Sequence, residues 1–277
     1  MKFLTLFVSI LAIAWPADAQ SAPPADKVDW SETYKVGSSA RLVVSNVWGT
    51  VNVRRGPAGE IGVTVSGEIS APDERRLERA RKLYAIELIT DPNAVELHVG
   101  GNNVQHWQQD PCRGCRAKYR FDIVVPEDAQ LDVGTVNDGR VDVEGVTGPV
   151  TAHNVNGPVS LIGLANCTNV EAVNGDVHME FVREPGAECH IDTINGDITV
   201  RMPVNTDIDL ALDLFNGRIV SDFEVEPLAL PAIVEQSSDE DGYEYRISQA
   251  AGLRIGSGGP LFTVASLNGD VNIRKTP

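Results

Sequence analysis

Three aspartates that follow an Asn-Gly pair could bind a cation. Asp176, Asp197 and Asp270 each come one residue after the glycine of such a pair. Calcium takes six to eight oxygen ligands, so aspartates stacked from repeat to repeat could line a calcium site. Other copies of the repeat hold arginine or proline at this position, and the Gly-Gly-x-Gly-x-Asp pattern of calcium-binding rolls is absent. We therefore predict solvated turn aspartates, with no metal and no other cofactor.

A second group of residues could serve polysaccharide cleavage. The tripeptide at 205–207, Asn-Thr-Asp, resembles a fragment of a polygalacturonase motif. Glycoside hydrolysis needs paired carboxylates facing one cleft, and no Asp-Asp or Gly-His-Gly element accompanies the tripeptide. We expect Asp207 and Asp209 on a solvent-facing side of a strand. Three histidines lie at different offsets from the repeat glycine and predict no catalytic triad; they are His153, His178 and His190.

Cys112 and Cys115 have the spacing of a redox motif. A redox motif needs a helix start after a strand, whereas loop and strand residues flank this pair. A zinc site that uses His98 or His106 is an alternative, but it lacks a second spaced pair of ligands. We favour a local disulfide that pins the loop. His106 and Trp107 in this loop are a possible recognition tip, or Trp107 packs beneath its own loop.

The other two cysteines, Cys167 and Cys189, precede successive Asn-Gly pairs by seven and six residues. Strands of adjacent repeats would lie about 5 Å apart, within reach of a disulfide. Three pairings of the four cysteines are possible, and Cys112 with Cys115 and Cys167 with Cys189 is the most local.

The Asn-Gly pair recurs with a period near 20 residues, which indicates a stacked repeat. Gly139, Gly157, Gly175, Gly196 and Gly217 are separated by 18, 18, 21 and 21 residues, and another copy follows 52 residues later. The predicted structural corners are Asn156, Gly157, Asn174, Gly175, Asn195, Gly196, Asn216, Gly217, Asn268 and Gly269.

These corners and the residues beside them predict the fold. Asn and Gly tolerate positive φ, so each pair is expected to turn between two short strands, and stacked Asn side chains can form amide ladders. Around one corner, we predict that Val173, Val177 and Met179 belong to the core. A meander would use each pair as a hairpin turn, but it does not require identical residues at fixed offsets. We therefore predict an all-β fold, a parallel β-solenoid (β-helix) with about 18–21 residues per coil.

The rest of the chain is divided by composition. Residues 1–19 are predicted to be a signal peptide, because a Lys, an apolar run and an Ala-x-Ala pattern follow one another. The apolar run of 13 residues is shorter than the roughly 20 needed to span a bilayer, which argues against a membrane anchor. Residues 20–32 are Pro/Ala-rich and are predicted to be a flexible lead-in. Residues 33–277 form a single predicted domain, with N-terminal strands and a Cys loop in 33–130 and repeat coils in 131–277. One short amphipathic helix is predicted from Pro72 to Leu83.

The net charge of −16 excludes some partners. An acidic surface repels nucleic acid and anionic lipid, so no nucleic-acid partner is expected. No transmembrane segment is expected after signal cleavage, and we predict a periplasmic or secreted protein.

The stretch "FDIVVPEDAQLDVGTVNDGRVDVEGVTGPVTAHNVNGPVSL", followed by further Asn-Gly-x-Val units, resembles the bacterial "putative adhesin" family. That family is a domain of unknown function, built as a β-solenoid and related to the head domains of autotransporter-like adhesins. The resemblance extends from Val43 to Ile273 and includes the helix. It implies no catalytic residues. The Cys loop and the acidic insert Glu235–Tyr245 depart from the family pattern.

Three functions follow as hypotheses. The first is a non-enzymatic adhesin-like or cell-envelope scaffold protein that contacts a protein or polysaccharide of the envelope. Contact would use a flat ladder face or the loops Gly101–Cys115 and Glu235–Tyr245. The second is a carbohydrate-active β-helix enzyme, which would need three or more carboxylates converging in a groove. The third is a periplasmic partner in envelope-stress signalling.

Overall fold

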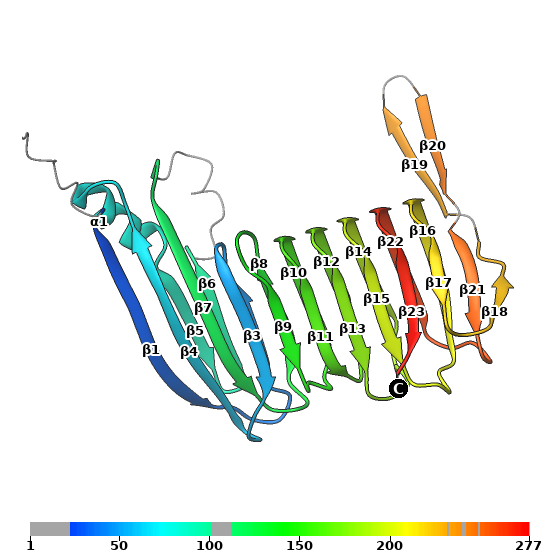
Figure 1. Cartoon of the computed structure of the whole chain (residues 1–277), viewed down its shortest axis with the longest axis horizontal. Helices are drawn as coiled ribbons and strands as arrows, with labels where there is room; N and C mark the ends of the chain where they lie inside the picture. Colours follow the sequence, from blue (N-terminus) through cyan, green and yellow to red (C-terminus); the bar gives the residue numbers. More distant parts are fainter. Residues whose placement is uncertain (1–22, 101–111, 232, 240–241, 249, 277) are drawn as a thin grey trace, which may run out of the picture.

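Two large β-sheets face each other across the core in the computed structural model (Figure 1). The structure describes residues 23–100, 112–231, 233–239, 242–248 and 250–276. The first part of the chain holds β1 (Ala25–Lys35), β2 (Arg41–Ser45), β3 (Gly49–Arg55), β4 (Glu60–Ser70), α1 (Glu74–Leu83), β5 (Ile86–Asp91), β6 (Ala94–Val99), β7 (Arg116–Val125), β8 (Gln130–Thr135), β9 (Val141–Glu144), β10 (Val150–Asn156) and β11 (Val159–Leu164). The second part holds β12 (Asn169–Asn174), β13 (Val177–Phe181), β14 (Cys189–Asn195), β15 (Ile198–Met202), β16 (Ile208–Asn216), β17 (Ile219–Ser221), β18 (Val225–Leu228), β19 (Ile233–Asp239), β20 (Gly242–Ser248), β21 (Ala251–Ile255), β22 (Leu261–Asn268) and β23 (Val271–Lys275).

The two sheets are mixed, with antiparallel pairs at one end of the ten-stranded sheet and at both ends of the eleven-stranded sheet, and parallel pairs elsewhere. The ten-stranded sheet has the order β1-β4-β7-β3-β9-β11-β13-β15-β23-β17. The eleven-stranded sheet has the order β18-β21-β16-β22-β14-β12-β10-β8-β2-β6-β5. Strands β22 and β23, shown in red in Figure 1, each lie between two strands that come earlier in the chain. β22 lies between β16 and β14, and β23 lies between β15 and β17.

The prediction of an all-β chain with one short helix is confirmed, but the predicted parallel β-solenoid is wrong. Antiparallel pairs join β1 to β4, β4 to β7, β5 to β6, and β21 to both β16 and β18. The regular Asn-Gly period covers only the parallel middle of the sheets. The flanking segments alternate without that period, and several of their strands, namely β1, β4, β5, β18 and β21, form antiparallel pairs.

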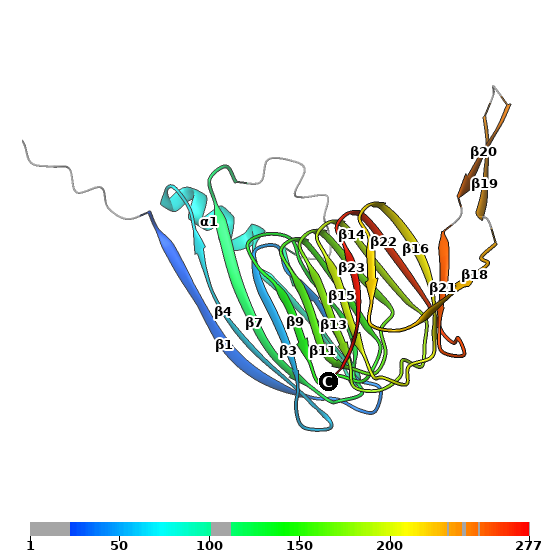
Figure 2. The ribbon, with the colours of Figure 1, turned by 45° about the vertical axis from the view of Figure 1, so that its right-hand side comes forward.

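Two other segments differ from their prediction. The lead-in expected over residues 20–32 includes most of β1, which pairs along its whole length with β4. Its half-buried Val28 and Trp30 pack against the core, and this anchors the strand. The acidic insert expected to be a loop is the antiparallel hairpin β19–β20, which projects beyond the sheets in both views (Figures 1 and 2).

The helix begins where the sequence indicates. The Asp73 side chain accepts a hydrogen bond from the Arg76 backbone N–H and caps the helix. Leu77, Ala80 and the C-cap residue Tyr84 are buried on one face. Within the residues that the structure describes, no helix combines the length and apolarity needed to cross a membrane.

The core between the sheets is built from the residues that follow each corner with a period of two. Val159, Val177 and Ile198 are buried on neighbouring parallel strands, as are the residues two positions later in each strand. Each parallel strand thus buries its inward face on near copies of itself. Val173 is an exception to the prediction, because it lies on the outer surface and is only half-buried.

Close packing is the requirement for glycine that all five corners share. None of the five corner asparagines has a positive φ, and of the five corner glycines only Gly157 and Gly196 have one, at 154° and 157°. A methyl group at any of the five corner glycines would lie 1.9–2.2 Å from the carbonyl oxygen of the neighbouring corner glycine. The backbones therefore touch at this column, and only a residue without Cβ fits there.

Candidate functional site

The corner asparagines form one continuous hydrogen-bonded ladder across the molecule. Each Nδ2 donates to the Oδ1 of the next asparagine, at 2.8–2.9 Å, in the order Asn216, Asn268, Asn195, Asn174, Asn156, Asn137. The five Asn-Gly pairs each link the end of a strand in the eleven-stranded sheet to a strand of the ten-stranded sheet. The amides are therefore used in holding adjacent strands in register.

The aspartates after the glycines hold the backbone of the next corner. The Oδ1 atom of Asp176 accepts from the N–H of Asp197 at 2.9 Å, and Oδ1 of Asp197 accepts from the N–H of Asp270 at 2.8 Å. Asp270 accepts from the N–H and from Nε of Arg218, which lowers the pKa of its carboxyl. Within the described residues, no group of three or more His, Cys, Asp or Glu is arranged to hold a metal ion.

The apolar residues just before the corner asparagines form a row on the outer face of the eleven-stranded sheet. This apolar ladder consists of Val155, Val173, Ile194, Leu267 and Phe215, on strands β10, β12, β14, β22 and β16. The register of the flanking residues places them side by side. The exposed fraction is 42% for Ile194, 46% for Leu267 and 75% for Phe215.

A row of carboxylates borders the apolar ladder two residues back along the same strands. This acidic row consists of Glu171 on β12, Asp192 on β14 and Asp213 on β16, while His153 on β10 and Ala265 on β22 occupy the equivalent positions. Ala265 is small, and the hollow above it has a volume of about 300 Å³. Asp192 and Asp213 line this groove together with Ile194, Leu267 and Phe215.

At the far end of the same sheet, Ser45, His98 and Glu96 lie together, a cluster that sequence reasoning missed. Ser45 Oγ lies 3.2 Å from His98 Nδ1, and His98 Nε2 lies 3.3 Å from Glu96 Oε2. Such a chain could activate a serine. Acyl transfer also needs N–H groups aimed at the developing oxyanion, and the N–H of Asn46 is bonded to the carbonyl of Gly134. The backbone N–H that follows Ser45 is therefore already bonded within the sheet.

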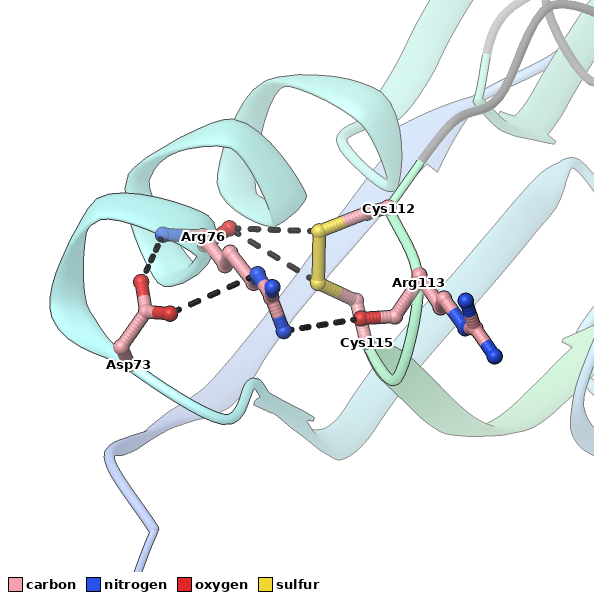
Figure 3. Close-up of a disulfide and its surroundings, with 5 residues drawn as sticks. All are labelled: Asp73, Arg76, Cys112, Arg113 and Cys115. Carbon is pink, nitrogen blue, oxygen red and sulfur yellow. Dashed lines mark hydrogen bonds and ion pairs between the residues drawn. A yellow bond between two sulfur atoms is a disulfide. The ribbon is translucent and has the colours of Figure 1, made fainter.

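The Cys112–Cys115 disulfide closes the turn that leads into β7 and packs against the start of the helix (Figure 3). The two sulfur atoms lie 3.6 and 3.8 Å from the carbonyl oxygen of Arg76. Oxidised sulfurs carry no proton, so these are packing contacts. Arg76 also donates to the carbonyl of Arg113 at 3.4 Å. The disulfide therefore closes the turn locally, and its sulfurs pack that turn against the start of the helix.

The second disulfide joins Cys167 to Cys189, with a Cα–Cα distance of 5.3 Å. It connects the turn before β12 to the start of β14, and these strands are parallel neighbours. This pairing of the four cysteines is the one predicted from their spacing. Both cysteines are buried, so the bond belongs to the core, at the opposite end of these strands from the apolar ladder.

The remaining predicted residues do not form a site. His106 and Trp107 lie outside the described residues. His178 is on the ten-stranded sheet, whereas His153 and His190 occupy different columns of the other sheet. Asp209 receives two hydrogen bonds from Arg254, at 2.7 and 2.9 Å, which lower the pKa of its carboxyl.

Asp207 is likewise satisfied within the chain, because its carboxylate accepts from the backbone N–H of Ser257 at 2.7 Å. Of the four grooves described on the surface, none is lined by more than two carboxylates. Asn205, Thr206 and Asp207 line none of them.

The outward position of the apolar ladder could have been predicted from the alternation of residues along the strands. In β10 the inward residues are Val150, Ala152 and Asn154, so alternation places Val155 outside. The buried Thr193 and Ser266 occupy the position of Asn154 in their own strands. In three of the five strands, a polar residue before the apolar one thus marks the inward position.

Comparisons with known proteins found only weak structural likenesses. No protein-family model matches the chain, and no curated protein matches it. A putative cell adhesion protein from Clostridium sporogenes is 11% identical with a TM-score of 0.37, over 90% of this chain and 100% of that chain. A putative adhesin from Bacteroides fragilis is 10% identical with a TM-score of 0.34, over 92% and 99%.

A putative lipid binding protein from Parabacteroides distasonis is 10% identical with a TM-score of 0.28, over 90% of this chain and 97% of that chain. These likenesses are too weak to assign a function to the chain. The resemblance to the putative adhesin family therefore stays a prediction.

Proposed function

We propose that the protein is an exported, non-enzymatic binding protein that works by surface contact, as an adhesin-like or cell-envelope scaffold protein. The observation that carries this proposal is the apolar ladder, whose three most exposed members adjoin on neighbouring strands. A row of adjoining exposed apolar side chains is typical of an interaction site, whereas single ones are common on any surface.

The arrangement of the carboxylates supports binding over polysaccharide cleavage. Asp192 and Asp213 lie on strands separated by β22, so their Cα atoms are about 9.6 Å apart across the groove. An inverting hydrolase could use such a spacing, but it also needs one carboxyl held protonated in an apolar pocket. The hollow between these two carboxylates is open and floored by Ala265.

Fractionation of the native host and capture of envelope components on the purified chain test this function. We expect the chain in the periplasmic or secreted fraction, and we expect it to retain an envelope protein or polysaccharide. The variant Phe215→Ser/Leu267→Ser should lose that component, whereas Val182→Ser/Val204→Ser should keep it. Val182 and Val204 are also exposed but line a different groove.

Equal capture by both variants and the unaltered chain would show that the apolar ladder is not the contact surface. Cleavage of an envelope polysaccharide by the chain, abolished in Asp192→Asn or Asp213→Asn, would replace the proposal by the enzymatic hypothesis. Capture of a signalling protein instead of a structural component would favour the role in envelope-stress signalling.

A further inference from the structure

We propose that the apolar ladder and the acidic row bind a basic amphipathic α-helix of a protein partner. The inference rests on the proposed function and names the chemistry of the partner. The helix would lie across the strands, with its apolar stripe on the apolar ladder and its Lys or Arg side chains over the acidic row.

The spacing of the apolar ladder fits a helix. Adjacent strands lie about 4.8 Å apart, so its five side chains span roughly 19 Å. One turn of an α-helix rises about 5.4 Å, so a helix of about 13 residues presents one apolar contact per strand over this length. An extended strand would need an open sheet edge for its hydrogen bonds, whereas the apolar ladder lies on a sheet face.

The charges favour a basic partner. The carboxylates of Asp192 and Asp213 have no ion pair or hydrogen bond among the described residues, and that of Glu171 accepts one hydrogen bond, from Asn169. Asp209, Asp222 and Asp270, in contrast, are paired with arginine. Unpaired carboxylates beside an apolar row attract Lys and Arg, whose methylene groups also pack on apolar side chains.

The hollow above Ala265 can receive one such basic side chain. It opens between the carboxylates of Asp192 and Asp213, with Leu267 and Phe215 along its wall. A Lys or Arg side chain entering there would bury its stem against Leu267 and place its charge between two acids. The cation would also lie near the Phe215 ring, which favours it further.

The same charges argue against two other occupants. A second copy of the chain carries the same net charge of −16 and would place its acidic row beside this one. An anionic lipid surface would be repelled in the same way. The partner that matches both the apolar and the acidic residues is a cationic amphipathic segment.

Binding of synthetic 18-residue peptides to the purified chain tests this inference. The probe is an amphipathic peptide of Leu and Lys, and its controls are the same pattern with Glu for Lys and a scrambled Leu/Lys sequence. We expect the Leu/Lys peptide to bind and gain helical circular dichroism, and both controls to bind at least about tenfold more weakly, a difference of about 1.4 kcal/mol.

Variants assign the binding to this surface. Phe215→Ser/Leu267→Ser and Asp192→Asn/Asp213→Asn should each weaken the Leu/Lys peptide about tenfold, the loss expected for a contact residue of moderate importance. Val182→Ser/Val204→Ser should bind normally, and thermal melting checks that each variant is folded. Equal binding by the scrambled peptide, or by either of the first two variants, would overturn the inference.

Two further outcomes would reject a basic helix as the occupant of this surface. A concentration-dependent dimer in sedimentation, lost in Phe215→Ser/Leu267→Ser, would assign the surface to a second copy. Capture of an envelope component that depends on the apolar ladder, with no binding of the Leu/Lys peptide, would retain the proposed function and reject only the helix. If the chain neither captures an envelope component nor binds the Leu/Lys peptide, both the proposed function and the helix are rejected.

Discussion

Replacement of Gly175 by alanine should destabilise the protein by about 3 kcal/mol. The added methyl group would lie 2.1 Å from the carbonyl oxygen of Gly157, so the two corners must separate by roughly 1 Å. Forcing a methyl group into a packed site costs about 1–3 kcal/mol. The separation also lengthens the bond from the Gly157 N–H to the Asn174 carbonyl, now 2.9 Å, at about 1 kcal/mol.

Urea denaturation followed by circular dichroism measures this loss, and the melting temperature should fall by roughly 6 °C. Gly186→Ala is the matched control, because the nearest atom to its added methyl would be Asn166 Oδ1 at an ordinary 3.5 Å. It should change stability by less than about 0.5 kcal/mol. If the two variants melt at the same temperature, close packing is not the reason for glycine at the corners.

Three further predictions concern the framework. Replacing both Cys167 and Cys189 by serine should lower stability by about 3 kcal/mol, from the loop-entropy value for a separation of 22 residues, and unreduced peptide mapping should show this pair in the unaltered chain. The hydrogen bonds from Arg254 lower the pKa of Asp209, so its carboxylate stabilises the fold above the usual pKa of 3.8, and this stability is lost as the pH falls below that value. In Asp209→Asn, the free energy of unfolding measured with urea should therefore decrease less steeply with falling pH below 3.8 than in the unaltered chain. Burial raises the pKa of Tyr119 to about 12, so stability should fall as the pH rises from 10 to 12, and Tyr119→Phe should reduce this slope in the same assay; Tyr34 and Tyr84, whose pKa values are also raised, account for the rest. An unchanged alkaline slope in that variant would contradict the assignment.

Local features of the sequence predicted the local structure well. The Asn-Gly pairs marked where strands end, because Asn and Gly recur there for contact with their neighbours. Asp73 marked the helix start, because its side chain satisfies a free N–H. The most local cysteine pairing was also correct, since Cys167 and Cys189 occupy neighbouring parallel strands.

The order of the strands in space could not be predicted. Asn268 lies between Asn195 and Asn216 in the amide ladder, although it follows both in the chain. Every Asn-Gly pair has the same hydrogen-bonding groups, so nothing local distinguishes one neighbour from another. The antiparallel ends of the sheets were missed for a related reason, because alternating strands carry no mark of direction.

The candidate site was missed because Val173, one member of the apolar ladder, was assigned to the core, and the row to which it belongs was not recognised. Ile194, Leu267 and Phe215 lie at an outward position that follows a buried polar residue or, for Phe215, the half-buried Leu214. Strand alternation decides the face of a residue more reliably than its hydrophobicity does. The pairing of Ser45 with His98 depends on sheet neighbours 53 residues apart, which no short motif reveals.

The position of β22 and β23 sets the order in which the protein can be completed. A chain that is synthesised, or threaded through an export channel, from its N-terminus delivers β16 and β17 before the strands that connect them to β14 and β15. Until residues 261–275 emerge, each sheet lacks one internal strand, β22 between β14 and β16 and β23 between β15 and β17. The last residues therefore close the fold, and a product cut short before them would carry two pairs of open edges instead of one frayed end.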